Sequence, residues 1–364
     1  SLTPADIDAV VEVIGGIEPA RELILAALAN GKPVVTANKE LLANVGSELF
    51  AAAEVAGVDL LFEAAVAGGI PLIRPLRESL VGERIARVLG LVNGTTNYIL
   101  TRMTEEGIGY AEALAEAQRL GYAERDPTAD VEGFDAGAKA AIIASIAFGC
   151  RVVAGDVYHE GISSLTPADI DAARKLGYVV KLLAIADRTL GPESRDSSVG
   201  VRVHPAMVPT THPLASVRDS YNAVFVEGEA VGNLMFYGRG AGGMPTASAV
   251  LGDLIDAAAN LRKGSHASLG ALGKATIRPI DEAESEYYLN IEVADRPGVL
   301  AAVAGVFGDH RVSIRAMEQE GLGDEARLVF ITHTARERDV QATIHGLREL
   351  DAVKRIVSML RVVG

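Results

Sequence analysis

The sequence is poor in several residue types that mark particular protein classes. Its 364 residues include a single cysteine, Cys150, and no tryptophan. One cysteine excludes an intramolecular disulfide framework and fits a reducing compartment. Cys150 follows an apolar segment, so we interpret it as a small buried residue rather than a nucleophile. No signal-peptide pattern is found, and a cytoplasmic location is expected.

Basic residues and long apolar runs are also scarce. There are 34 Lys and Arg against 48 Asp and Glu, which gives a formal net charge of -14. Because phosphate binding needs clustered basic residues, this balance argues against a nucleic-acid partner. No uncharged apolar run of about 18 residues suggests a membrane span. Hydrophobic residues are abundant, at 49%, so the chain is expected to be globular, and its 364 residues are enough for two or three domains.

The first part of the chain alternates strand-like and helix-like segments. This order predicts βαβ units and a parallel, Rossmann-like sheet in an α/β domain over 1–70, with ligands at the carboxyl ends of the strands. Gly15 and Lys39 lie at two such ends. Strands are predicted at 9–14, 33–38 and 58–66, and helices at 18–31 and 39–57.

The remaining chain predicts two further α+β domains. Residues 71–244 are helical at first and strand-rich later, and we expect them to form one domain, to which the resemblance given below assigns catalysis and dimerisation. A helix over 245–263 is expected to return to the first domain, and 264–284 is interpreted as a linker. Residues 285–364 follow a βαββαβ order, which predicts a ferredoxin-like module.

One charged pair stands out in an otherwise apolar segment. In "DVEGFDAGAKAAIIASIAFG", Asp135 and Lys139 share a helix face, while the rest of 134–148 is Phe, Ala, Gly, Ile and one Ser. On a helix with a polar side, such a pair is usually exposed and contributes little. An all-apolar helix is buried, and burying two ions costs several kcal/mol. The pattern therefore favours a functional site.

Six motifs in order resemble a known family. They are "VEVIGG", "VVTANKELLA", "FEAAVAGGIPLI", "NGTTNYIL", "AQRLGYAERDPTADVEGFDAGAKAAI" and "GRGAGGMPTASAVLGD". Together they resemble homoserine dehydrogenase of the large form with a C-terminal ACT regulatory domain. The segment "VADRPGVLAAVAGVF" is similar to the ligand loop and first helix of an ACT domain.

One departure concerns the cofactor domain. The family opens with a strand and a Gly-x-Gly-x-x-Gly loop that binds pyrophosphate, and no such stretch precedes Ser1. We therefore expect the printed chain to lack roughly the first half of the cofactor domain, either by truncation or because further residues precede Ser1. The alternative function is a catalytically incomplete ACT-bearing regulatory or structural fragment.

The resemblance implies a reaction and residues for it. The reaction is the NAD- or NADP-dependent interconversion of L-homoserine and L-aspartate 4-semialdehyde in threonine and methionine biosynthesis. Lys139 is implied as the general acid, and Lys39 as the residue between nicotinamide and substrate. The other implied residues are Glu124, Asp135, Asp130, Thr95, Gly94 and Tyr122 for the substrate, and Gly15, Lys39, Gly121 and Gly242 for the cofactor. Plainer interpretations are a loop acid for Glu124, a helix N-cap for Gly94 and Thr95, a C-cap for Gly121 and a loop hinge for Gly242.

The resemblance also implies a cation site, an effector and an oligomer. A monovalent cation, with sodium expected, would be held by the carboxylate of Glu63 and the carbonyls of Val66, Gly68 and Ile70. L-Threonine is the implied effector, at the turn from Asp295 to Gly298. A homodimer or homotetramer is expected.

Two other enzyme classes fit less well. Aspartate-semialdehyde dehydrogenase needs a cysteine nucleophile beside a histidine, and no histidine motif lies near Cys150. An ACT-bearing hydroxyacid dehydrogenase would have a His–carboxylate pair where this chain has Lys139.

Overall fold

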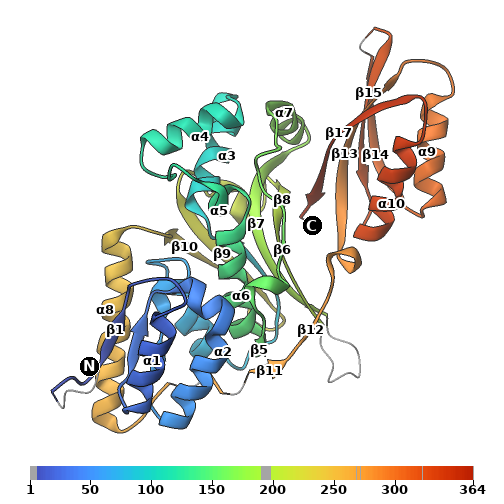
Figure 1. The fold of residues 1–364 in the computed structure, drawn as a ribbon. Coiled ribbons are helices and arrows are strands. Elements are labelled where there is room, and N and C mark those ends of the chain that lie inside the picture. Colours follow the sequence, from blue (N-terminus) through green and yellow to red (C-terminus); the bar gives the residue numbers. More distant parts are fainter. Residues whose placement is uncertain (1–5, 190–197, 268, 271, 322, 364) are drawn as a thin grey trace. The chain divides into compact units, whose positions relative to one another are not determined.

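The computed structural model describes residues 6–189, 198–267, 269–270, 272–321 and 323–363. The chain divides into two compact units (Figure 1). Unit 1 comprises Ser1–Ser164, Leu182–His204 and Ser216–Ile277, and unit 2 comprises Leu165–Lys181, Pro205–Ala215 and Arg278–Gly364. None of the described helices combines the length and apolarity needed to cross a membrane.

Unit 1 begins with a three-stranded sheet that is parallel, as predicted, and its strands lie in the order β1-β2-β3. Val35 and Leu61 on this sheet pack against Ala257 of the long helix α8, the segment that was expected to return to the first domain. The third strand is shorter than expected, because after Leu61 the chain turns into the 3₁₀ helix η1. The bounds are β1 Val10–Glu12, α1 Ala20–Ala29, β2 Val34–Thr36, α2 Lys39–Ala56, β3 Leu60–Leu61, η1 Glu63–Ala65 and α8 Gly243–Lys263.

The sequence explains the ends of α2. The side chain of Asn38 accepts a hydrogen bond from Leu41 N at 3.0 Å, which caps the first turn. Gly57 ends the helix at a φ of 65°, a left-handed conformation that glycine adopts without strain. The cap puts Lys39 in the first helical turn, directly after the carboxyl end of β2.

A second, mostly antiparallel sheet of unit 1 carries the helices of the site. β4 pairs antiparallel with β7 and β9, and β9 pairs with β10. The bounds are η2 Pro75–Ser79, β4 Ile85–Leu91, α3 Gly94–Glu106, α4 Tyr110–Arg119, α5 Thr128–Val131, α6 Phe134–Phe148, β5 Cys150–Arg151, η3 Ala154–Asp156, β6 Tyr158–His159, β7 Tyr178–Thr189, β8 Ser198–Pro209, η4 Pro213–Ser216, β9 Tyr221–Gly228 and β10 Gly232–Arg239.

The helix α6 is buried along most of its length, as its composition predicted. Ala136, Gly137, all residues from Ala140 to Ile146, and Phe148 are buried. Phe134 is the exception, with 53% of its surface exposed. The segment interpreted as a linker contains two short strands, β11 Gly273–Lys274 and β12 Thr276–Ile277, which pair in parallel with β5 and β8. The limits of the domains otherwise stay predictions.

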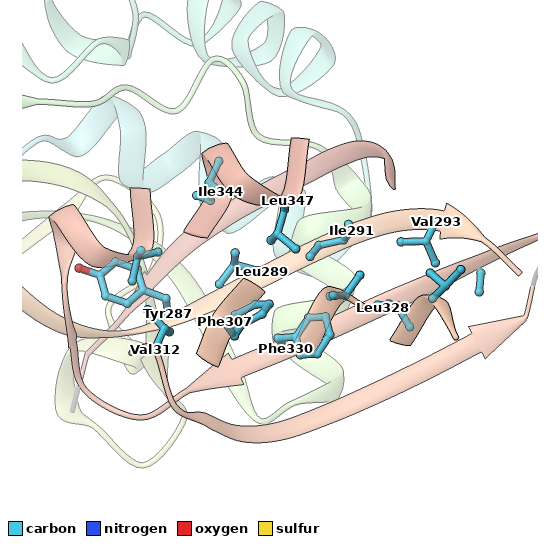
Figure 2. Close-up of a cluster of buried hydrophobic side chains, with 14 residues drawn as sticks. Tyr287, Leu289, Ile291, Val293, Phe307, Val312, Leu328, Phe330, Ile344 and Leu347 are labelled. Atoms are coloured by element: carbon cyan, nitrogen blue, oxygen red, sulfur yellow. The ribbon is translucent and has the colours of Figure 1, made fainter. Parts of the chain in front are cut away.

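Unit 2 contains the predicted βαββαβ module. Its four main strands are ordered β17-β13-β15-β14, and α9 and α10 cover one face. Figure 2 shows the core of this face, where Phe307 lies close to Phe330 and alternate residues of β13, from Tyr287 to Val293, point inward. The bounds are α7 Pro167–Lys175, η5 Ile280–Glu282, β13 Glu284–Ala294, α9 Val299–Asp309, β14 Ile314–Gly321, β15 Glu325–Thr332, β16 Ala335–Arg336, α10 Glu337–Arg348 and β17 Val353–Val362.

A buried ion pair joins three elements of this module. Arg361 of β17 donates Nε to Glu337 Oε2 at 2.7 Å and Nη2 to Oε1 at 2.8 Å, and the Tyr287 hydroxyl of β13 donates to the same carboxylate. Burial acts to raise the pKa of Glu337, but the Arg361 guanidinium outweighs it and holds that pKa below its usual range. The pair therefore stabilises the module at neutral pH, and this contribution is lost as the pH falls through the depressed pKa.

We predict that Glu337→Ala lowers the free energy of unfolding at neutral pH by about 3–5 kcal/mol, because it leaves a buried guanidinium without its carboxylate. The measurement is urea denaturation followed by circular dichroism. Lys354→Ala breaks the exposed pair with Glu325 and serves as control, with an expected loss of about 1 kcal/mol or less. Equal losses in the two variants would contradict the prediction.

Candidate active site

The carboxylate of Asp135 binds two lysines from different parts of unit 1. Lys139, one turn along α6, donates Nζ to Asp135 Oδ2 at 2.7 Å. Lys39, the first residue of α2, places Nζ 3.0 Å from Asp135 Oδ1. The side chains of Asp135 and Lys139 are only 10% and 13% exposed, whereas that of Lys39 is 45% exposed. Nearly complete burial of the pair, inferred from the apolar helix, is confirmed.

The charges in this cluster depend on one another. Burial acts to raise the pKa of Asp135, but the ammonium groups of Lys139 and Lys39, together with hydrogen bonds, hold that pKa well below its usual range. Burial acts to lower the pKa of Lys39, and the Asp135 carboxylate outweighs it, so the Lys39 pKa is raised. At neutral pH Asp135 is an anion and Lys39 a cation, and each charge stabilises the other.

The carboxyl end of β4 fixes the other side of the cluster. Lys139 Nζ also donates to Val92 O at 2.7 Å. Asn93 donates Nδ2 to Asp130 Oδ1 at 2.6 Å and to Asp135 Oδ2 at 3.0 Å. Sequence reasoning missed Val92 and Asn93. The available signal was their position, since they directly follow a strand whose end faces the apolar helix.

The turn after β1 is built around a buried carboxylate. Glu12, 5% exposed, accepts hydrogen bonds from Gly15 N and from Thr36 Oγ1. Asn38, which caps α2, donates Nδ2 to Gly16 O at 2.7 Å. The turn containing Gly15 and the start of the helix of Lys39 are therefore tied together, which keeps two predicted cofactor residues close to each other.

Gly94 and Thr95 begin α3, but the N-cap is Asn93. Thr95 donates Oγ1 to Tyr122 O at 2.6 Å, which ties α3 to the loop after α4. A Cβ at Gly94 would lie 2.8 Å from Ser220 O, so this position is sterically restricted. The Tyr122 ring lies 4.8 Å from that of Tyr98 and is partly exposed. These predicted substrate residues thus share one loop and one helix start.

Glu124 and Gly121 lie on the same loop as Tyr122, but neither contacts the charged cluster through a hydrogen bond or ion pair among the described residues. Glu124 is exposed, and within the described residues its carboxylate forms no hydrogen bond or ion pair with Asp135 or Lys139. Its backbone carbonyl accepts a hydrogen bond from Gln118. Gly121 has a φ of 79° just after α4, in agreement with the helix-end interpretation.

The glycine-rich loop before α8 meets the predicted cation loop. A Cβ at Gly68 would come within 2.3 Å of Gly240 O, and Gly69 N donates to Arg239 O. Gly242 has a φ of 120°. Glycine is thus required where the two loops touch.

The carboxylate of Glu63 is engaged by the backbone. It is buried and accepts hydrogen bonds from the amides of Leu72, Ile73 and Arg74, while Glu63 N donates to Asp253 Oδ2 at 2.7 Å. In the described part of the chain, no cluster of three or more His, Cys, Asp or Glu side chains could hold a metal ion. Ligation by Glu63, Val66, Gly68 and Ile70 would thus depend mainly on carbonyl oxygens, and it stays a prediction.

The predicted effector turn belongs to unit 2. Gly298 is the residue before α9, with a φ of 87°, and a Cβ there would meet no atom within 4 Å. Asp295 N donates to Asp324 O at 3.0 Å. The turn is therefore sterically open on the glycine side, at the N-terminus of an 11-residue helix.

Comparisons with known proteins agree on one family. A model described as homoserine dehydrogenase matches residues 71–255, and a model of the homoserine dehydrogenase NAD-binding domain matches residues 1–63. The homoserine dehydrogenase of Corynebacterium glutamicum is 54% identical over 357 residues, which cover 98% of this chain and 80% of that protein. The chain belongs to the homoserine dehydrogenase family.

Other relatives of this family extend the likeness. The homoserine dehydrogenase of Mycobacterium tuberculosis is 54% identical over 366 residues, covering 99% of this chain and 83% of that protein. A crystal structure from Thiobacillus denitrificans matches with a TM-score of 0.92 and 44% identity, over 98% of this chain and 82% of that one. One from S. aureus has a TM-score of 0.77 and 34% identity, over 100% and 83%. An ACT domain model matches residues 287–350, which confirms the C-terminal module.

Family membership settles the competing enzyme classes. Homoserine dehydrogenases are NAD(P)-dependent oxidoreductases, and the NAD-binding match over 1–63 covers Gly15 and Lys39. Cys150 is buried, and burial raises the pKa of its thiol. A thiol with a raised pKa is a poor nucleophile at neutral pH, which agrees with its interpretation as a structural residue.

We predict that adding one methyl group at the start of α6, by Gly137→Ala, destabilises the fold. A Cβ at Gly137 would lie 1.9 Å from His159 Cε1, so Gly137→Ala must displace the ring or the helix that carries Asp135 and Lys139. The expected cost is about 1–3 kcal/mol of unfolding free energy, measured by thermal denaturation. Adding His159→Ala should recover part of it. Gly155→Ala is the control, because no atom lies within 4 Å of a Cβ there; a loss of equal size in that control would refute the explanation.

Proposed function

We propose that this chain interconverts L-homoserine and L-aspartate 4-semialdehyde with NAD or NADP, in threonine and methionine biosynthesis. Membership of the homoserine dehydrogenase family supports the activity. The observation that carries the proposed site is the Asp135 carboxylate held between Lys139 and Lys39. It supplies in one place a fixed anion and two ammonium groups, near the carboxyl ends of β2 and β4.

The substrate has an α-ammonium, an α-carboxylate and a reacting oxygen, and each needs a different partner. In the proposal Asp135 and Asp130 bind the ammonium. Glu124 and Tyr122, on the loop after α4, are further substrate-binding residues. Gly94 and Thr95 bind the carboxylate with backbone donors at a helix start, where the helix dipole favours an anion. The Thr95 hydroxyl donates to Tyr122 O and would have to turn away from that carbonyl to add a further donor. Each of these groups is a hydrogen-bonding partner of the type that its substrate group requires.

Lys139 is proposed as the proton donor to the developing alkoxide, and as the acceptor in the reverse direction. An ammonium group has three N–H donors. Two of them are used by Asp135 Oδ2 and Val92 O, which leaves one for the substrate oxygen. The nicotinamide, when bound, supplies or accepts the hydride. Lys39, partly exposed and tied to Asp135, lies between the two reactants in this proposal.

Cofactor and assembly complete the proposal. Gly15, Gly121 and Gly242 would let backbone approach the cofactor, and each has a positive φ that only glycine adopts readily. The choice between NAD and NADP stays open. A homodimer or homotetramer, a cytoplasmic location, and L-threonine as effector at Asp295–Gly298 remain predictions.

Lys139→Ala should reduce turnover of homoserine by about 100-fold or more, because general acid-base catalysis contributes about that much. The assay is nicotinamide reduction at saturating homoserine, together with a thermal unfolding midpoint to show that the fold is kept. Lys263→Ala, an exposed lysine at the end of α8, is the control. Near-normal turnover in Lys139→Ala would exclude the assigned role. If unsubstituted protein neither binds the nucleotide nor turns over, the regulatory or structural fragment is favoured instead.

The cation prediction is tested by replacing sodium with tetramethylammonium at constant ionic strength. Sodium should raise the thermal unfolding midpoint, because a hard cation bound to oxygen ligands stabilises only the folded state. Gly68→Ala, which would push its loop against Gly240, should abolish that difference. An identical midpoint in both salts would exclude the site.

Gly298→Val should weaken inhibition by L-threonine while leaving uninhibited turnover unchanged. The side chain would cover backbone amides at the helix start and strain a residue whose φ is 87°. Inhibition curves on the full chain, with Gly305→Ala on α9 as control, are the measurement. If calorimetry shows no threonine binding to the module and threonine does not inhibit the protein, the prediction is wrong. The module would then serve only in dimerisation.

A further inference from the structure

We propose that Asn93 is a positioning residue that sets the spacing and orientation of the Asp130 and Asp135 carboxylates. This rests on the proposed function, in which those two carboxylates bind the substrate ammonium. Asn93 is 6% exposed and lies at the junction between β4 and α3. It contacts neither nicotinamide nor reacting atoms in the proposal, so it acts through the two acids.

The orientation of the Asn93 amide is fixed by its own neighbours. Its Oδ1 accepts a hydrogen bond from Thr96 N at 2.9 Å, and a backbone N–H can be paired only with the oxygen of an amide. The Nδ2 must therefore point the other way. There it donates one hydrogen to Asp130 Oδ1 and one to Asp135 Oδ2, so both N–H groups are used on carboxylates.

This arrangement joins three helices through one side chain. The amide oxygen caps α3, while the nitrogen binds Asp130 of α5 and Asp135 of α6. The two carboxylates share one donor atom and are therefore close enough to repel each other. A neutral donor between them offsets that repulsion without supplying a competing cation.

The charged groups around Asn93 come from three elements. Asp130 belongs to α5, Asp135 and Lys139 to α6, and Lys39 to α2. Both ammonium groups bind Asp135, and the Asn93 amide is the described hydrogen-bond donor to the Asp130 carboxylate. Loss of the Asn93 amide should thus change the position of the Asp130 carboxylate more than that of the Asp135 carboxylate.

Two substitutions separate capping from positioning. Asn93→Ser keeps a residue that caps helices well but cannot reach both acids, and Asn93→Asp keeps size and cap but replaces the donor with a third carboxylate. A residue that only caps α3 would tolerate both, because serine, aspartate and asparagine are similarly good N-caps.

The first measurement is the thermal unfolding midpoint against pH, which needs no activity. Three adjacent carboxylates raise the pKa of one of them, so Asn93→Asp should be destabilised at about pH 8. As the pH falls through the raised pKa, the substituted carboxyl gains a proton, becomes a donor and recovers stability by about pH 5. Asn44→Asp makes the same change at an exposed position of α2 and should show no such recovery.

The second measurement is the steady-state kinetics of homoserine oxidation. Asn93→Ser should raise KM for homoserine by about 10- to 100-fold, the effect of losing a hydrogen bond to a charged group. The fall in kcat should be smaller, because Lys139 keeps its bonds to Asp135 and Val92.

The outcomes separate the two proposals. An unchanged KM in Asn93→Ser, or an Asn93→Asp midpoint equal to that of the unsubstituted protein at both pH values, would overturn the role of Asn93. If the unsubstituted protein does not oxidise homoserine, the proposed function fails, and the midpoints still decide whether Asn93 holds the two acids.

Discussion

The ion pairs of Asp135 are the interaction on which the site depends. A carboxylate that is 10% exposed in an apolar helix is costly unless it is paired. Here two ammonium groups and one amide bind it, and together they outweigh the effect of burial on its pKa. Removing any one of these partners leaves the buried Asp135 carboxylate incompletely paired. The effects of substituting Lys39, Lys139 and Asn93 on activity and stability are therefore expected not to be additive.

Strand ends bring these partners together. Lys39 follows β2, Val92 and Asn93 follow β4, and Asp135 and Lys139 lie in the first two turns of α6. Side-chain caps then fix where α2 and α3 begin. Asn38 caps α2 just before Lys39, and Asn93 caps α3 while binding two acids. Two asparagines therefore serve both the ends of helices and the geometry of the site.

The sequence predicts the elements of this fold better than its polar contacts. Alternating strand-like and helix-like segments predicted β1 to β3 and the C-terminal βαββαβ order, and an almost wholly apolar composition predicted the buried helix α6, because both kinds of pattern reflect the burial of apolar surface. The apolar composition of α6 also indicated Asp135 and Lys139. Val92 was missed because its contact is made by a carbonyl, which leaves no trace in side-chain type.

Other contacts depend on folding at a distance. The amides that bind the Glu63 carboxylate lie about ten residues further along the chain, so the sequence pattern does not reveal them. The role of a cation ligand for Glu63 came from the family resemblance. Glu124 was implied as a substrate residue by the resemblance, but it is exposed on a loop, and the sequence pattern does not fix the position of such a side chain. Asn93 and Asp130 are separated by 37 residues. They become neighbours because α6 packs against β4 while α5 packs against α6 and α3.

The most direct test of the central role of Asp135 is the kcat/KM for homoserine of the isosteric variant Asp135→Asn. Our account predicts a fall of about 100-fold or more with the fold retained, because the variant removes the charge that holds both lysines and binds the substrate ammonium. A kcat/KM close to that of the unsubstituted protein would contradict it.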